Sequence, residues 1–171
     1  VIWTTTPWTL PANLGISVHP DFEYVTVQVG DPYSVVAETL LGAVAEMCGW
    51  SDYKVVDKVI GQKLDRALAK HPFIDGQDSL LMVGTHVTAD AGTGLVHTAP
   101  GHGREDYEIG MKYNLPVYSP VDEAGRYDAR VKEFEGQNIW KVNPLIVEKL
   151  KGLGKLLSLQ TIKHSYPNCW R

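Results

Sequence analysis

Three consecutive threonines mark the first segment whose residue types could do chemistry, residues 3–13 (WTTTPWTLPAN). Side chains alternate along an extended chain, so Thr4, Thr5 and Thr6 would present hydroxyls on both faces of a strand. Proline then ends or bends that strand, and Trp8 adds a flat wall with one hydrogen-bond donor. Such a surface suits a small ligand that is partly polar and partly apolar. A threonine-rich strand followed by a proline turn, with no ligand, fits the same pattern.

A second group of reactive residue types lies in residues 92–107, GTGLVHTAPGHGREDY. The pattern predicts a strand that delivers His97, a loop rich in glycine and proline, and a helix that starts near Asp106. This order would gather N–H groups and side chains at one rim, and glycine lets a backbone approach a ligand closely. Structural interpretations stay open for both residues: His97 as a hydrogen-bonded core histidine, and Asp106 as an acid that complements the helix N-terminus.

A metal site and a phosphate loop are the other sites that these residues could form. His97, His102 and Asp106 carry donor types that zinc prefers, but their spacing matches no common zinc motif. Gly92-Thr93-Gly94 resembles the start of a GxGxxG phosphate loop, yet the third glycine is missing. No Ser-His-Asp or Cys-His arrangement points to a covalent nucleophile. We therefore expect neither a metal nor a cofactor in this domain.

The two segments together resemble the editing insertion of isoleucyl-tRNA synthetases. WTTTPWTLPAN is followed, about 80 residues later, by GTGLVHTAPGHGREDYEIGMKYNLP. The final HSYPNCWR resembles the point where that insertion returns to the synthetase catalytic domain, although Asn168 stands where histidine is common. The valyl and leucyl enzymes carry Thr-Arg-Pro-acidic-Thr where this chain has Thr5-Thr6-Pro7-Trp8-Thr9. The match is therefore specific to the isoleucyl enzymes.

The resemblance implies hydrolysis of valine wrongly esterified to isoleucine tRNA, with isoleucine excluded by its size. Editing of the adenylate before transfer to tRNA is left open. The implied catalytic residues are Thr5, Thr6, His97 and Asp106. The implied substrate-binding residues are Thr4, Trp8, Thr9, Asn13 and, again, Asp106.

Each of these residues has an implied role. Asp106 matches the aspartate that binds the substrate ammonium group, and the helix dipole should keep its carboxylate ionised. The three threonines would bond the ester and ribose oxygens and help to position water. Trp8 and His97 match residues that wall the side-chain pocket, and Asn13 would add a polar contact. Two roles are open for His97. It would either form a wall of the pocket while the substrate itself assists the attack of water, or act as a general base.

Short strands with a few helices predict the α+β class, as a small β-barrel of about six strands with peripheral helices. The expected strands are residues 22–29, 33–37, 53–60, 80–88, 93–98 and 156–162. A first helix should cover residues 40–48 and end at Gly49, and a second should run from Gly103 to before Asn114. A third should have Asn143 as N-cap, Pro144 in first position and a glycine terminator, at Gly152 or Gly154. Residues 63–70 fit either a helix or a strand.

Composition limits the alternatives. The 171 residues are 44% hydrophobic and 21% charged, as expected for one globular domain, residues 1–171. No stretch is apolar enough to predict a membrane span. Cys48 and Cys169 form no disulfide framework, which fits a reducing cytoplasm. The chain opens in a strand-like Val1-Ile2-Trp3 without methionine, so we expect it to be excised from a larger class I synthetase.

The charge bears on partners. A net charge of −4 and a pI near 5.8 are unlike a stand-alone nucleic-acid binder, which needs a basic face. The expected partners are the 3′ end of isoleucine tRNA and the remainder of the parent synthetase, which would supply most of the tRNA affinity. ATP and magnesium are expected only in the parent catalytic domain. A non-catalytic module that binds the tRNA 3′ end, and a metal-dependent hydrolase, remain alternative functions.

Overall fold

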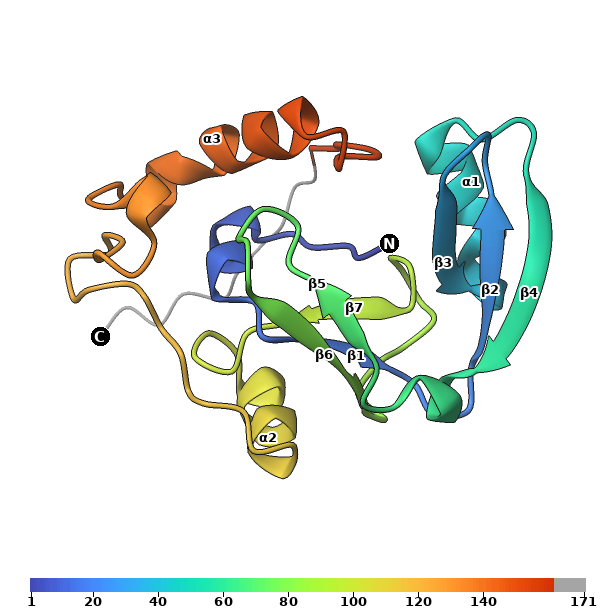
Figure 1. The fold of residues 1–171 in the computed structure, drawn as a ribbon, viewed down its shortest axis with the longest axis horizontal. Helices are drawn as coiled ribbons and strands as arrows, with labels where there is room; N and C mark the ends of the chain where they lie inside the picture. Colours follow the sequence, from blue (N-terminus) through green and yellow to red (C-terminus); the bar gives the residue numbers. More distant parts are fainter. Residues whose placement is uncertain (162–171) are drawn as a thin grey trace.

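A four-stranded mixed sheet carries the centre of the molecule. The computed structural model describes residues 1–161. The strands lie in the order β5 (Leu68–Lys70), β6 (Asp78–Val83), β1 (Gly15–Val18) and β7 (Leu95–Thr98). Strand β1 pairs in parallel with β6 and antiparallel with β7, so it lies in the interior of the sheet (Figure 1).

A separate antiparallel sheet forms one end of the molecule (Figure 1). It has the order β3 (Tyr33–Ala37), β2 (Glu23–Gln28) and β4 (Lys54–Ile60). Helix α1 (Leu41–Cys48) packs on one face of this sheet and ends at Gly49, whose φ of 67° is the left-handed value that glycine adopts without a steric cost. These strands and this helix are close to the expected ones.

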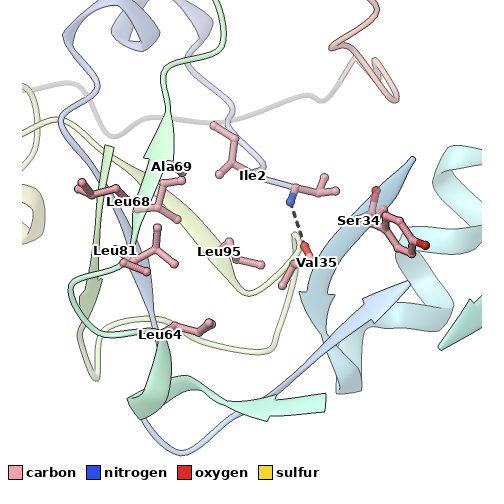
Figure 2. Close-up of a pocket in the computed structure, with 12 residues that line it drawn as sticks. Ile2, Ser34, Val35, Leu64, Leu68, Ala69, Leu81 and Leu95 are labelled. Atoms are coloured by element: carbon pink, nitrogen blue, oxygen red, sulfur yellow. Dashed lines mark hydrogen bonds between the residues drawn. The ribbon is translucent and has the colours of Figure 1, made fainter. Parts of the chain in front are cut away.

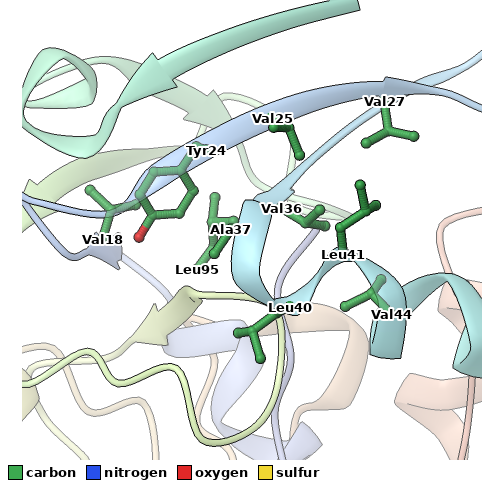
Figure 3. Packing of buried hydrophobic residues seen from close by; sticks show 10 residues of the cluster. All are labelled: Val18, Tyr24, Val25, Val27, Val36, Ala37, Leu40, Leu41, Val44 and Leu95. Atoms are coloured by element: carbon green, nitrogen blue, oxygen red, sulfur yellow. The ribbon is translucent and has the colours of Figure 1, made fainter. Parts of the chain in front are cut away.

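The two sheets meet at the turn before β7. Figure 3 shows Tyr24 of β2 and Ala37 of β3 beside Leu95 of β7 in one buried cluster. The Tyr24 hydroxyl donates to the Gly94 carbonyl at 2.7 Å, and the Ala37 N–H donates to the Thr93 carbonyl at 2.8 Å. Gly94 has a φ of 76°, and a Cβ there would lie 2.4 Å from the Cβ of Ala37. A glycine is therefore required for the close approach of the sheets.

Two further helices flank the four-stranded sheet. Helix α2 (Arg104–Lys112) begins after Gly103 and ends before Asn114, as predicted, and Ile109 packs on Met82 of β6. Helix α3 (Ile139–Gly152) buries Val142, Ile146 and Leu150 in a second cluster that includes Leu10 and Phe134. In residues 1–161 no helix combines the length and the apolar character that crossing a membrane requires. Short 3-10 helices complete the chain: η1 (Pro7–Ala12), η2 (Glu38–Leu40), η3 (Gly61–Leu64) and η4 (Lys132–Phe134).

The predicted start of the third helix was wrong. Asn138 is the N-cap of α3, and its side chain accepts a hydrogen bond from Trp140 N–H at 3.0 Å. Asn143 and Pro144 lie inside the helix, which continues to the predicted glycine, Gly152. Pro144 removes one helical hydrogen bond, the one to the carbonyl of Trp140, and it is exposed. The Asn143-Pro144 pair, which is typical of a helix N-terminus, therefore lies in the second turn of α3.

Several strand predictions also need correction. The expected strand over residues 80–88 ends at Val83, and residues 63–70 divide between η3 and β5. Residues 156–161 form no strand, and the rest of that prediction and HSYPNCWR lie outside the described residues. The mixed α+β class is confirmed. The strands of residues 1–161 form two sheets, and no closed barrel is found among their pairings.

Candidate functional site

The threonine segment is not a strand. Trp3 makes only an isolated parallel bridge to Val96, and η1 starts directly at Pro7. Ahead of η1 the chain turns, because Thr6 N–H donates to Thr4 Oγ1 at 3.0 Å. Proline suits the first position of a helix, where its missing N–H costs nothing. Strand-like alternation of the three hydroxyls was therefore the wrong geometry, and the threonines instead form the turn before η1.

The end of η1 brings the first motif against the second. Leu14 N–H donates to the Thr98 carbonyl at 3.1 Å, and β1 then continues along β7 with Ile16 opposite His97. Residues separated by more than 80 positions along the sequence thus become neighbours. His97 is 7% exposed, and it lies between side chains from η1 and from the end of that helix.

Both ring nitrogens of His97 have partners. Nε2 lies 2.9 Å from Thr9 Oγ1, and Nδ1 lies 2.6 Å from Asn13 Nδ2. The Thr9 hydroxyl also reaches the Thr6 carbonyl at 2.8 Å. Burial, with smaller contributions from His71 and His102, lowers the pKa of His97 to about 4. The ring is therefore neutral near pH 7 and has no free nitrogen, which favours a wall over a general base.

Asn13 is an internal residue of this network. Its side chain donates to the Gly15 carbonyl at 2.8 Å and accepts from the Ser79 hydroxyl, and Gln77 donates to its backbone carbonyl. Asn13 is 2% exposed. Both polar atoms of this side chain therefore already have partners within the protein. Thr9, also buried, has its hydroxyl committed in the same way, so both residues support the site from within.

Asp106 lies at the rim of the same region. It occupies the first turn of α2, and its Oδ2 accepts from Ala99 N–H at 2.8 Å, two residues after His97. Burial raises the pKa of this carboxyl above its usual value, and the Ala99 N–H and nearby His86 oppose that rise. Burial thus acts against the ionisation that the helix dipole was expected to favour. Within residues 1–161 no hydrogen-bond donor meets Oδ1.

Trp8 forms another side of this region. Its ring meets that of His102 edge-on, with centroids 5.0 Å apart. Its backbone carbonyl accepts a hydrogen bond from the Tyr127 hydroxyl. Thr5 is exposed, and its hydroxyl lies 3.3 Å from that of Thr6. The segments that meet at His97 therefore carry hydroxyls, an indole and a carboxylate, groups that can bind a small polar group beside an apolar one.

Comparisons with known proteins agree on one enzyme class. The isoleucine--tRNA ligase of Desulfovibrio desulfuricans is 52% identical over all 171 residues, and that of Lactobacillus acidophilus is 57% identical over the same span. The chain covers 18% of the length of each relative. No protein-family profile matches it. This chain is homologous to a segment of isoleucine--tRNA ligases.

Solved structures extend this result to the fold. The crystal structure of GlLeuRS-CP1 superposes with a TM-score of 0.68 at 18% identity, over 96% of this chain and 83% of that one. The editing domain of the Plasmodium falciparum cytosolic leucyl-tRNA synthetase gives 0.66 at 13% identity, over 88% and 76%. At such identities the likeness concerns the fold alone. This chain therefore shares its fold with leucyl-tRNA synthetase editing domains.

Glycines of the second motif pack closely on other parts of the protein. Gly92, with a φ of 83°, lies against Trp3, and a Cβ on Gly101 would lie 2.3 Å from the Tyr118 carbonyl oxygen. A side chain at either position would therefore meet neighbouring protein atoms. The two glycines let the loop before α2 pack on neighbouring backbone, and this packing holds the rim in place.

The supporting residues could not be found from motifs. Ser79, Gln77 and Tyr127 lie far from both motifs in sequence and belong to types that are common everywhere in proteins. His71 also holds η1 in place: its Nε2 is 2.9 Å from the Leu10 carbonyl, and its Nδ1 accepts from Ile74 N–H at 2.9 Å. The pairing of β1 with β6 brings Ser79 to the site, and contacts outside the strands bring His71 and Tyr127 to η1.

Possible metal ligands and one apolar cavity were compared with the candidate residues in the described chain. Residues 1–161 contain no group of three His, Cys, Asp or Glu side chains placed to hold a metal ion. A cavity of about 360 Å³ between the sheets (Figure 2) is lined mainly by apolar residues such as Ile2, Leu64, Leu81 and Leu95. None of the candidate site residues lines it, so this cavity is separate from the rim.

Proposed function

We propose that this segment is an editing site that hydrolyses valine wrongly esterified to isoleucine tRNA. The observation that carries the proposal is the contact between the two motifs. Thr9 and Asn13 both meet His97, and Ala99 links the same strand end to Asp106. Homology to isoleucine--tRNA ligases supports an editing function in the parent enzyme.

The need for a second site is physical. Valine lacks one methylene of isoleucine, a difference worth only about 1–3 kcal/mol in an apolar pocket, as is known from the isoleucyl-tRNA synthetases themselves. A site that admits valine and excludes isoleucine removes the resulting errors. Trp8 and His97 are rigid groups that could exclude the larger side chain by contact, because each is fixed by partners from another element.

Charge and hydroxyl groups account for the rest of the substrate. The free Oδ1 of Asp106 is proposed to bind the substrate ammonium group, and the new ion pair would lower the pKa that burial raises. Thr4, Thr5 and Thr6 are proposed to bond the ester and ribose oxygens and to place a water. An ester is already activated, so positioned water and oxyanion stabilisation suffice for hydrolysis. His97 is proposed as a wall and not as the base.

The surroundings of the reaction are also proposed. The segment acts without a cofactor, and ATP and magnesium belong to the catalytic domain of the parent synthetase. Its partners are the 3′-terminal adenosine of isoleucine tRNA and the rest of that synthetase, in the cytoplasm. With a net charge of −4, the isolated segment would bind tRNA weakly.

The central test removes the charge of Asp106 with little change of shape. Asp106→Asn should slow the release of valine from valyl-tRNA for isoleucine by roughly 10- to 100-fold, since a hydrogen bond to a charged group contributes about 1.5–3 kcal/mol. The rate at which the full chain deacylates labelled valyl-tRNA measures this. Wild type should also release valine faster than isoleucine.

Glu105→Gln is the matched control. Glu105 lies in the same turn of α2 and loses the same charge, but it is exposed. This variant should keep its rate within about twofold, because an exposed charge contributes little. Equal rates for Asp106→Asn and wild type would overturn the ammonium contact. Tight binding of the ester without turnover by wild type would instead favour a non-catalytic binding module, and activity lost in excess chelator would favour a metal-dependent hydrolase.

A further inference from the structure

Hydrogen-bond direction can be followed from the ends of the His97 network. Two backbone carbonyls terminate it, Gly15 beside Asn13 and Thr6 beside Thr9, and a carbonyl oxygen can only accept. The partner atom at each end must therefore be a donor. This requirement fixes the direction of every bond between the two ends.

At one end the amide nitrogen of Asn13 must face the Gly15 carbonyl. The second N–H of that nitrogen then points at His97 Nδ1, 2.6 Å away, so Nδ1 must carry no proton. At the other end Thr9 gives its only hydroxyl proton to the Thr6 carbonyl. Its oxygen must then accept from His97 Nε2 at 2.9 Å. Both ends independently require the same neutral ring, protonated on Nε2.

Ser79 holds the amide of Asn13 in this orientation. Its hydroxyl lies against Asn13 Oδ1, which can only accept. The four side chains of this hydrogen-bond network are those of Ser79, Asn13, His97 and Thr9. Each is at most 7% exposed, so water cannot easily replace any of the bonds. A lost partner would leave a buried polar atom unsatisfied.

We propose that Asn13 and Ser79 are positioning residues that hold His97 as its Nε2–H tautomer and thereby fix its ring as the wall that excludes isoleucine. The tautomer follows from the network alone, whereas the exclusion of isoleucine rests on the proposed function. The two parts therefore need separate measurements. Thr9 and Thr6 complete the connection from the ring to the threonine turn.

The tautomer is tested by nitrogen NMR of the 171-residue chain labelled in its histidines. At pH 7, His97 should show a protonated Nε2 and an unprotonated Nδ1. Asn13→Asp should reverse or abolish this state, because a carboxylate at that position accepts a hydrogen bond from a protonated Nδ1 and cannot donate one. A wild-type Nδ1–H signal, or an unchanged tautomer in folded Asn13→Asp, would overturn the proposal.

Selectivity is tested with a pair of buried serines. Ser79→Ala should lower the ratio of valyl to isoleucyl ester hydrolysis by roughly tenfold, the scale of one lost hydrogen bond. Ser17→Ala is the matched control: Ser17 lies in the adjacent strand, is 0% exposed, and bonds Thr98 at 2.8 Å outside the network. It should keep the wild-type ratio and the wild-type tautomer.

The outcomes separate the two proposals. Equal ratios in Ser79→Ala and Ser17→Ala would overturn the positioning role of Ser79. If the wild-type chain hydrolyses neither ester, the proposed function fails, and the NMR result alone decides whether Asn13 sets the tautomer. Should Asn13→Asp not fold, a mixture of His97 tautomers in Ser79→Ala supports the proposal, and an unmixed wild-type signal overturns it.

Discussion

His97 is a buried imidazole that the fold keeps uncharged. Desolvation lowers its pKa, and protonation would also set two donors, Nδ1–H and the Asn13 amide, against each other. The consequence extends beyond the site. A group that resists protonation in the folded chain but not in the unfolded chain makes stability depend on pH.

The pH prediction follows with its sign. The His97 pKa falls from an ordinary 6.5 to about 4 on folding, so the unfolded state binds the proton first as pH decreases. Stability from this residue is complete above about pH 6.5 and is lost as pH falls toward 4, by up to roughly 3 kcal/mol. His97→Gln should remove this part of the slope. Urea unfolding at several pH values measures it, and identical slopes for both proteins would contradict the prediction.

For single residues, the sequence identified which residue types could take part in the site, but it could not predict the directions of their hydrogen bonds. The pattern of the second motif predicted His97 and Asp106 at one rim, and the resemblance implied that the threonine motif joins them. The fold brings these segments together. A polar contact between Asn13 and substrate was implied by the resemblance. The burial of Asn13 depends on Ser79, sixty-six positions away, and no local pattern encodes that pairing.

At the scale of elements, η1 and α3 hold each other. Leu10 of η1 packs into the cluster formed by Val142, Ile146 and Leu150 of α3. The capping signals of Asn143, Pro144 and a terminal glycine were enough to predict a helix there. The start was wrong because the Asn-Pro signal at residues 143–144 outweighed Asn138, whose capping depends on an actual hydrogen bond to Trp140 N–H.

Replacing Asn138 and Asn143 separately by alanine tests which of them is the N-cap of α3. Asn138→Ala should lower the free energy of unfolding by about 1 kcal/mol, the usual cost of a lost N-cap. Asn143→Ala should be close to neutral, because within residues 1–161 its Oδ1 is buried without a hydrogen-bond partner. Chemical denaturation of both variants gives the comparison. A larger loss for Asn143→Ala would show that the helix begins there.

For the whole molecule, the turn at residues 92–94 joins two independent sheets. The alternation in residues 22–29 and 93–98 predicted the strands on both sides of this junction. The predicted closed barrel was not found in the described residues. Pairing between strands distant in sequence depends on register, and on short strands such as β1 and β5 that the sequence pattern hardly marks.

Gly94→Ala tests the junction. A methyl group there meets Ala37 and also takes an unfavourable φ, so the loss of unfolding free energy should exceed about 2 kcal/mol. Gly30→Ala has a similar φ of 63° but nothing within 4 Å, so it should lose only about 1–2 kcal/mol. Thermal and urea unfolding measure both. Equal losses would mean that the sheets can separate locally without cost.

The hydrogen bond from Tyr127 to the Trp8 carbonyl has a consequence for the order in which the molecule melts. Trp8 is held on one side by the region around α3, whose core cluster is distinct from that of either sheet. Local opening of such a unit can precede global unfolding. Amide exchange would then detect an early partial opening in which both sheets are intact while the indole at the rim has already lost its support. The temperature limit of function would therefore lie below that of the fold.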